Sequence, residues 1–455
     1  MNILTIDHYS FLKGASLTDY SNDAGYSPLS YGFEVDRTTT LGLLCSGRNL
    51  IDYSTNLADN IVSKTEYRIT SLGSGYVSIG DAGKVYFTDL ANPTHTVKDT
   101  ITGKNFDTNS CAFTYKDGLY ITSQNDIYYD DFTFTIKQKT WWTVTKGKTA
   151  LTTGVPHKIF EFNGVMFVLN GNKIASWDGT TATDAAFTLP TGWVITDAQV
   201  DNDNIFLTAY LSLNGFGYNR PSRIFVWNGI TTITWQREIP VASTDLQSIK
   251  KADQGFVLFG GSNMYFFDGY NIQWLRYIPN TPNFNQVIYA NGNVLFVAYQ
   301  GIASYNTRFK IYTHPISWTG AINTLGVGFL DHIDIMSASG NHFYRGVTNT
   351  CTSTIFYSNW YDLQNSFVRR VEVCFSTPLA TGATYDFRIY DESGNAVYTR
   401  TISRAVDGNI TKFSINPVGV RAAVAQVRMT WNNSANSNIR YIKLFYEQSE
   451  NNFSK

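Results

Sequence analysis

The chain has 455 residues, a length that suits one large domain and one smaller domain. Hydrophobic residues make up 43% and charged residues only 16%, so the chain can bury a substantial core and is not a disordered protein. The 35 Lys and Arg balance 36 Asp and Glu, and this formal net charge of -1 provides no overall field that would favour nucleic acid or a membrane surface.

Aromatic residues reach 15%, and together with abundant Gly, Asn and Thr they favour strands and tight turns over helices. We therefore expect an all-β protein. The N-terminal sequence has acidic and polar residues where a secretory signal needs a basic start and an apolar run, and no apolar stretch is long enough for a membrane helix. We expect folding in a reducing cytoplasm, with four free and mostly buried thiols at Cys45, Cys111, Cys351 and Cys374.

Residues 1–60 precede the repetitive part of the chain, and we expect an extended segment that closes the following domain or contacts a neighbour. From residue 61 to 362 one pattern recurs: two apolar strands around a Gly, Asn or Asp turn, the second strand ending in an aromatic residue followed by Asp or Asn. The clearest copies are 162–179, 252–269 and 290–306. The first apolar residue of each second strand recurs on average every 45 residues, at Val85, Ile127, Ile174, Ile224, Met264, Ile302 and Ile355.

A period of 40 to 50 residues is typical of a four-stranded propeller blade. Within the hairpins the alternation has period two, so that Phe160 and Phe162 share one face and Glu161 lies on the other. One such sheet cannot bury both of its faces alone, but neighbouring sheets stacked around an axis can. The repeat therefore predicts a six- or seven-bladed β-propeller over 61–362, with a β-solenoid or a stack of unrelated hairpins as the alternatives.

The repeat ends near residue 362, and residues 363–455 show a cleaner alternation with no period. About six strands are expected, with apolar faces at Val371, Val373 and Phe375 in one strand, for example, and at Val427, Met429 and Trp431 in another. This pattern predicts a C-terminal β-sandwich.

The sequence contains no convincing set of catalytic residues. No glycine-rich phosphate loop precedes a helix, and no G-x-S-x-G elbow is present. The repeated acids Asp89, Asp131, Asp178 and Asp268 occupy one equivalent position after each strand, which favours Asx capping of a turn over catalysis. We expect no enzymatic activity and no catalytic or cofactor-binding residues, with a carbohydrate-active enzyme as the weakest alternative.

The best metal candidate is His332 with Asp334, which would share one face of a strand. Two residues do not complete a site, so no metal is expected. Residues 201–204 resemble the start of a calcium loop, but Phe206 stands where the loop needs glycine, which indicates a turn.

Several aromatic residues could form a sugar-binding ladder or a core. The equivalent positions Trp177, Trp227, Phe267 and Tyr305 favour packing between blades. Trp141, Trp142 and Trp235 do not follow the repeat, and an exposed ring among them could contact glycan.

Both ends of the chain resemble propeller-containing tail proteins of bacteriophages. The opening has a G-x-x-L phrase from Gly14 to Leu17, then Ser27-Pro28-Leu29, and a closing Gly47; Ser46-Gly47 stands where that group customarily has arginine and proline. The sequences at 360–376 and 438–447 are similar to the C-terminal module of that group.

The resemblance implies a structural component of the virion, a tail nozzle or tail-tip protein that assembles into a homo-oligomeric ring at the DNA exit path. The expected partners are other tail or connector proteins, with genomic DNA passing without sequence-specific binding, and the expected location is the virion tail after folding in the host cytoplasm. The alternative is a host-receptor or glycan-binding propeller, that is, an adhesin.

Overall fold

The structure is a computed structural model, and its described residues form two compact units. The propeller unit comprises Ile51–Ala298 and Gly320–Arg345, and the sandwich unit comprises Met1–Leu50, Tyr299–Thr319 and Gly346–Lys455. The structure describes residues 1–6, 33–35, 44–46, 48–52, 59–69, 73–89, 95–101, 106–116, 118–133, 140–212, 220–290, 292–298, 301–308, 311–317, 322–327, 333–337, 343–350, 353–357, 361–391, 393, 395–416, 418–432 and 439–447.

The propeller unit begins with five antiparallel sheets in which strands adjacent in sequence pair with each other. The first two sheets contain β5 (Ile61–Ile69), β6 (Gly73–Gly80), β7 (Lys84–Asp89) and β8 (His95–Thr100), then β9 (Ala112–Tyr115), β10 (Gly118–Thr122) and β11 (Ile127–Asp130). The third and fourth contain β12 (Ile159–Phe162), β13 (Val165–Asn170), β14 (Lys173–Trp177) and β15 (Ala182–Thr188), then β16 (Trp193–Asp201), β17 (Asn204–Leu211), β18 (Pro221–Trp227) and β19 (Arg237–Thr244). The fifth contains β20 (Leu246–Ala252), β21 (Gly255–Gly260), β22 (Asn263–Phe267) and β23 (Ile272–Tyr277).

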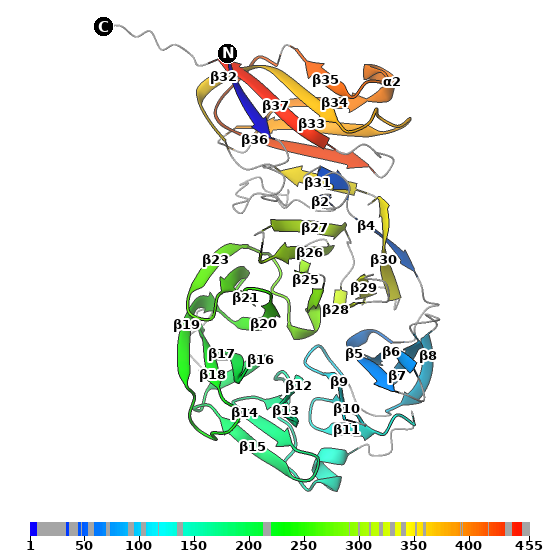
Figure 1. Cartoon of the computed structure of the whole chain (residues 1–455), viewed down its shortest axis with the longest axis vertical. Helices are drawn as coiled ribbons and strands as arrows, with labels where there is room; N and C mark the ends of the chain where they lie inside the picture. Colours follow the sequence, from blue (N-terminus) through cyan, green and yellow to red (C-terminus); the bar gives the residue numbers. More distant parts are fainter. Residues whose placement is uncertain are drawn as a thin grey trace, which may run out of the picture. The chain divides into compact units, whose positions relative to one another are not determined.

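Two further hairpins and two short helical turns complete the propeller unit. They are β24 (Val287–Ala290) with β25 (Asn293–Ala298), β28 (Ile322–Val327) with β29 (Ile333–Ser337), the π-helical turn η1 (Trp141–Thr145) and the 3-10 turn η2 (Phe284–Gln286). The first strands of the successive sheets touch in a closed cycle, in the order β5, β9, β12, β16, β20, β24, β28 and back to β5. Figure 1 shows the sheets of this unit set around a common centre. The prediction of a six- or seven-bladed β-propeller is confirmed, and the cycle of first strands has seven members.

Local sequence explains the hairpins. Between β12 and β13, Asn163 and Gly164 both have positive φ, 50° and 74°, and Asn-Gly is the favoured pair for a two-residue turn of this hand. In β12, Phe160 and Phe162 are buried while Glu161 is exposed, as the alternation predicted. The stretch 201–204 is likewise a hairpin turn, joining β16 to β17 with Asn202 at a φ of 51°.

The propeller core is divided into seams, each a hydrophobic cluster shared by two consecutive sheets. Clusters of this kind join the first sheet to the second, the second to the third, the third to the fourth and the fourth to the fifth. In the seam of the third and fourth sheets, Phe167 and Phe187 lie against Trp227 with ring centroids 5.3 and 4.8 Å away. Each sheet therefore depends on its neighbours to cover its apolar faces.

The sandwich unit contains two four-stranded antiparallel sheets. Their strands are β31 (Ser353–Tyr357), β32 (Tyr361–Phe375), β33 (Thr384–Tyr390), β34 (Ala396–Ser403), β35 (Lys412–Ile415), β36 (Val420–Asn432), β37 (Ile439–Glu447) and β1 (Asn2–Ile6). One sheet has the order β34-β33-β36-β31 and the other the order β35-β32-β37-β1, and β32 also pairs with β36. The predicted apolar faces of β32 and β36 are buried between the two sheets. The prediction of a C-terminal β-sandwich is confirmed, with N-terminal strand β1 as one of its members.

The sandwich unit also holds α2 (Arg404–Asp407), β2 (Phe33–Val35), β3 (Leu44–Ser46), β26 (Gly301–Asn306) and β27 (Ile311–Ser317). Two strands, β4 (Arg48–Asp52) and β30 (Phe343–Thr350), have residues in both units. Ile355, which the repeat placed in a seventh propeller hairpin, lies instead in β31 and pairs with Thr430 of β36. The seventh first strand of the propeller is β28, whose sequence departs from the repeat.

Candidate functional site

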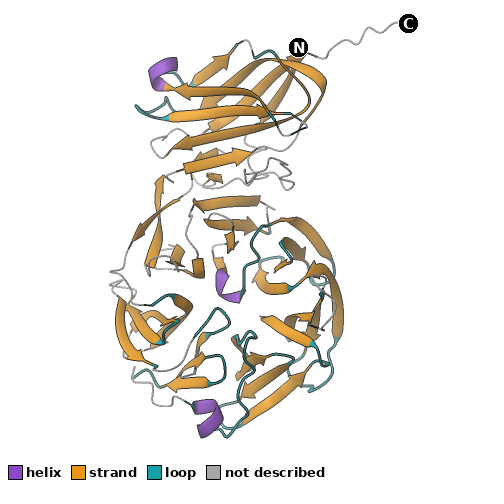
Figure 2. Ribbon diagram, turned by 180° about the vertical axis from the view of Figure 1, so that it is seen from behind, coloured by secondary structure: helices purple, strands orange, loops and turns teal. Residues whose placement is uncertain are grey.

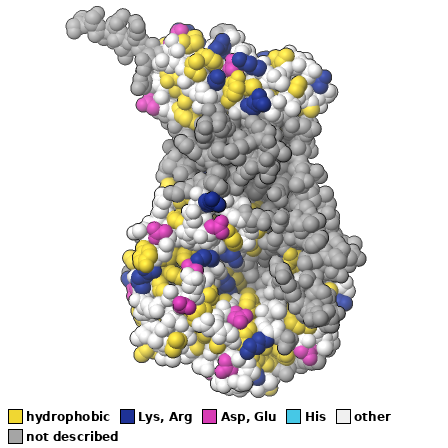
Figure 3. All heavy atoms as spheres, in the orientation of Figure 1, with side chains coloured by type: hydrophobic (Ala, Val, Ile, Leu, Met, Phe, Trp, Pro, Cys, Tyr) yellow, Lys and Arg dark blue, Asp and Glu magenta, His cyan; other side chains and the backbone are white. Residues whose placement is uncertain are grey.

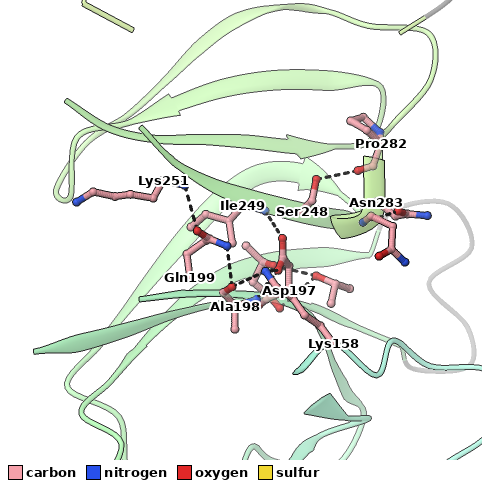
Figure 4. A network of polar contacts seen from close by, with 12 residues as sticks. Lys158, Asp197, Ala198, Gln199, Ser248, Ile249, Lys251, Pro282 and Asn283 are labelled. Atoms are coloured by element: carbon pink, nitrogen blue, oxygen red, sulfur yellow. Dashed lines mark hydrogen bonds and ion pairs between the residues drawn. The ribbon is translucent and has the colours of Figure 1, made fainter. Parts of the chain in front are cut away.

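The inner ends of the third, fourth and fifth sheets carry a buried ion pair between Lys158 and Asp197 (Figure 4). Lys158 directly precedes β12, and Asp197 lies at a β-bulge in β16. A bulge changes the direction of a side chain relative to a regular strand, and the Asp197 side chain is 2% exposed. The pair therefore joins the third sheet to the fourth in a place sheltered from water.

Every oxygen of the Asp197 carboxylate has a protein donor. Oδ1 accepts from Lys158 Nζ and from the Ala198 backbone N–H at 2.7 Å, and Oδ2 accepts from the Ile249 N–H of β20 at 2.9 Å. Lys158 Nζ also donates to the Ala198 carbonyl at 2.7 Å. A carboxylate bonded in this way holds three consecutive sheets together.

Lys250 follows Ile249 on β20 and is the reactive group nearest to this pair. Its pKa is lowered to about 8, chiefly by burial and also by the positive charge of Lys158, while Asp197 opposes the shift. Within the described part of the chain the Lys250 ammonium makes no hydrogen bond or ion pair. An amine with this pKa is partly neutral at mildly alkaline pH.

The turn η2 bridges sheets that are distant in sequence. Asn285 donates through Nδ2 to the carbonyls of Thr108 and Ser110, at 3.1 and 2.9 Å, and accepts from Ser63 Oγ at 3.1 Å. Gln286 donates to the Ile322 carbonyl at 2.7 Å. Figure 2 shows this short helix inside the ring of sheets. The segment therefore ties the first, second and seventh positions of the ring together.

Two of the repeated acids, Asp178 and Asp268, cap turns, as predicted. Asp178 Oδ1 accepts from the backbone N–H groups of Thr180 and Thr181, both at 2.7 Å, and Asp268 Oδ1 accepts in the same way from Tyr270 and Asn271. The bonds from Thr181 and Thr180 lower the pKa of Asp178 to about 2. Asp131 accepts from the Thr133 hydroxyl at 2.8 Å, and the side chain of Asp89 lies outside the described residues.

Three of the equivalent aromatic residues, Trp177, Trp227 and Phe267, pack between consecutive sheets, as predicted. Tyr305 is also buried, but it lies in β26 of the sandwich unit. The expectation that Trp141 or Trp142 could expose a ring to glycan is wrong. Both are buried in η1, because Trp141 packs edge-on against Trp177 with ring centroids 5.3 Å apart. Trp235 is half-buried against Phe225, with ring centroids 5.1 Å apart.

Other residues considered in the sequence contribute no site. His332 lies outside the described residues, and Asp334 lies in β29 with a side chain outside the description. Among the described residues, no group of three or more His, Cys, Asp or Glu side chains is placed to hold a metal ion. Cys111 and Cys374 are free and buried, as expected, and burial raises the pKa of the Cys111 thiol to about 11.

Neither the charges on the propeller surface nor the helices of the described residues indicate a particular partner. Charged side chains of both signs are scattered over the face of the propeller unit shown in Figure 3. None of the helices in the described parts of the chain is long and apolar enough to cross a membrane.

No protein family and no curated protein sequence matches this chain. Among solved structures, the extracellular domain of a hybrid two-component system from B. thetaiotaomicron is similar with a TM-score of 0.51 and 10% identity, over 92% of this chain and 62% of that one. The N-terminal domain of Nup159 gives a TM-score of 0.43 with 12% identity, over 66% of this chain and 96% of that one. The WD40 domain of Neurospora crassa Pan2 gives 0.46 with 10% identity, over 67% and 97%.

Likeness at this level of identity concerns the fold alone. The seven touching first strands, the shared seams and the two packed sheets define the class: a β-propeller protein with a β-sandwich.

Proposed function

We propose that this chain is a non-enzymatic structural component of a bacteriophage tail, of the nozzle or tail-tip type, that assembles into a ring. Two kinds of observation support the proposal. The sequences at both ends of the chain resemble such proteins, and the repeated acids Asp178 and Asp268 cap turns while Asp197 joins sheets.

The unpaired edge strands of the sandwich are the main observation that supports assembly into an oligomer. Strand β34 pairs only with β33, and β1 pairs only with β37, so within the described residues each has one edge without a strand partner. On β1, Ile3 is 54% exposed. An unpaired edge offers backbone N–H and carbonyl groups to a strand of another copy, which is a low-cost route to a closed oligomer.

In the proposed ring, a DNA path would be enclosed by several copies of the chain, each contributing one propeller and one sandwich.

The test is the assembly state of the full chain. Native mass spectrometry and negative-stain electron microscopy should show a closed ring, and Ile3→Lys should weaken it by adding a charge to an edge strand. Head, portal and tail genes on either side of this gene would support a role in a bacteriophage tail. A chain that stays monomeric at all concentrations and binds intact cells would support the adhesin alternative instead. Hydrolysis of a polysaccharide, abolished by one Asp or Glu substitution, would establish an enzyme.

A further inference from the structure

Exposed aromatic side chains are concentrated on one sheet. In the described parts of the chain, the aromatic residues that are exposed to solvent are Tyr270 at 79%, Tyr277 at 54% and Trp274 at 43%. All three lie in β23 or in the turn that leads into it, in the fifth sheet. Most other described aromatic rings lie in the seams or the sandwich core. These three residues therefore differ from most aromatic residues of the described fold, which are buried.

A β-bulge places two of these rings on one face. Residues three apart on a regular strand point to opposite faces. In β23 the register shifts, so that Trp274 lies opposite Tyr265 and Tyr277 lies opposite Asn263, two neighbours on the same face of β22. Leu275 is the extra residue, and it is buried. The bulge thus places both large rings on one face, about 7 Å apart along the strand, since their partners on β22 are two residues apart at ~3.3 Å per residue.

The third ring lies toward the same side of the sheet. Tyr265, on the shared face, donates its hydroxyl to the Ala242 carbonyl of β19 at 2.6 Å, so this face is turned toward the fourth sheet. Arg237, also on β19, lies with its guanidinium 4.9 Å from the Tyr270 ring centroid and donates to the Gly269 carbonyl. Figure 1 shows β19 and β23 following each other along the outer margin of the ring of sheets.

The central ring of the three is held in place. Trp274 Nε1 donates to Asn263 Oδ1 at 2.9 Å, and Asn263 Nδ2 donates to the Gly261 carbonyl at 2.8 Å. The bond to Asn263 restricts the orientation of this partly exposed indole. Fixing a contact surface before binding reduces the entropy lost on binding.

We propose that Tyr270, Trp274 and Tyr277 form a binding platform for a neutral polysaccharide chain. Sugar rings have apolar C–H faces that stack on aromatic faces, and hydroxyl edges that bond to amides. The amides of Asn263 and Asn271 lie beside Trp274 and Tyr270 in turn, and the cation Arg237 is already engaged with Tyr270 and Gly269. Isolated rings among amides suit a saccharide better than a protein partner, whose contact area requires a contiguous apolar centre.

This inference does not rest on the proposed place in a phage tail. A monomeric chain could use the platform, and a ring could form without it. The assembly experiment and the binding experiment therefore fail independently.

The experiment is a screen of the purified full chain on a printed glycan array, followed by affinity electrophoresis in gels containing the best polysaccharide found, with laminarin, xylan and glucomannan as fixed probes. We expect retardation by at least one neutral polysaccharide. Trp274→Ala and Tyr277→Ala should each weaken binding about tenfold, and the double variant should abolish it. Asn263→Leu, which frees the indole but leaves all three rings, should weaken binding to a smaller extent because Asn263 is a positioning residue.

The matched control is Ile230→Ala with Ile233→Ala, which removes two exposed aliphatic side chains, 80% and 71% exposed, from the equivalent turn region of the fourth sheet. These changes should leave saccharide binding unchanged. The proposal is overturned if the folded wild-type chain binds none of the arrayed glycans or probes, if binding survives the double variant, or if the isoleucine control loses binding to the same extent. The proposal is also overturned if the wild-type chain binds a protein and no saccharide, and the double variant loses that protein binding.

Discussion

The propeller unit and the sandwich unit solve the same problem, burial of apolar sheet faces, in different ways. The propeller spreads its core over several seams, each shared by two consecutive sheets, and adds buried polar bonds that run from one sheet to the backbone of the next. The sandwich has one core between two sheets and bonds its buried acid Glu372 to other side chains, Lys412 and Tyr441. A substitution in a propeller seam should therefore destabilise the two sheets that share the seam, whereas a substitution in the sandwich core should destabilise the whole sandwich unit.

The largest effect is expected from removing one tryptophan from each unit. Trp227→Ala in a propeller seam and Trp431→Ala in the sandwich core should each lower the free energy of unfolding by about 3–5 kcal/mol. Hydrogen exchange read by mass spectrometry should show faster exchange in the third and fourth sheets for the first variant, and throughout the sandwich for the second. Uniform loss of protection along the whole chain in either variant would contradict the comparison.

The ion pair at the inner ends of the sheets should come next. Asp197→Ala leaves Lys158 without its carboxylate and the Ile249 N–H without an acceptor, and should lower the free energy of unfolding by about 3 kcal/mol. The control is Asp201→Ala on the same strand, which breaks the more exposed pair with Lys251 and should change stability by less than about 1 kcal/mol. Urea titration of both variants checks this, and equal losses would refute a special role for Asp197.

In the sandwich, stability should depend on pH through Glu372. Burial alone would raise the pKa of Glu372, but bonds from Lys412 and Tyr441 outweigh it and hold the pKa below its ordinary value of 4.5. A carboxyl with a lowered pKa contributes stability that is complete above the pKa of the unfolded chain and is lost as the pH falls through the folded pKa. Glu372→Gln should thus cost about 2 kcal/mol at pH 7, and the difference from wild type should shrink progressively in melts as the pH falls below 4.5. A constant difference across that range would show that charge is not the cause.

The smallest expected change in stability comes from Lys250, and here the substitution should stabilise the protein. Because the pKa of Lys250 is lowered to about 8 from 10.5, the folded chain loses this proton before the unfolded chain does. Wild-type stability should therefore gain a contribution as the pH rises from about 8 to 10.5. Lys250→Met should stabilise the protein at pH 7 by about 1 kcal/mol and remove that gain. Thermal melts at pH 7 and pH 10 test it, and a destabilised variant at pH 7 would contradict the assignment.

Much of this architecture could be predicted from the sequence because hairpins, turn residues and alternation are local. The position equivalent to Trp177 and Trp227 was correctly assigned to the core because it recurs with the repeat. Ile355 was misplaced because its hairpin resembles a propeller repeat, and its pairing with β36 is set by residues some seventy positions away. The bond from Asp197 to Ile249 and the face shared by Trp274 and Tyr277 both depend on bulges, which leave no clear mark in the order of residues.

The pairing of β1 with β37, Asn2 opposite Tyr446, has a consequence for synthesis. A ribosome makes β1 long before its partner β37, so β1 has no edge to join until β37 has emerged. The five consecutive sheets of the propeller can pair as they emerge, because their strands are adjacent in sequence. The capture of β1 must therefore wait for β37, and a nascent chain stalled before residue 439 should carry a folded propeller and an unfinished sandwich.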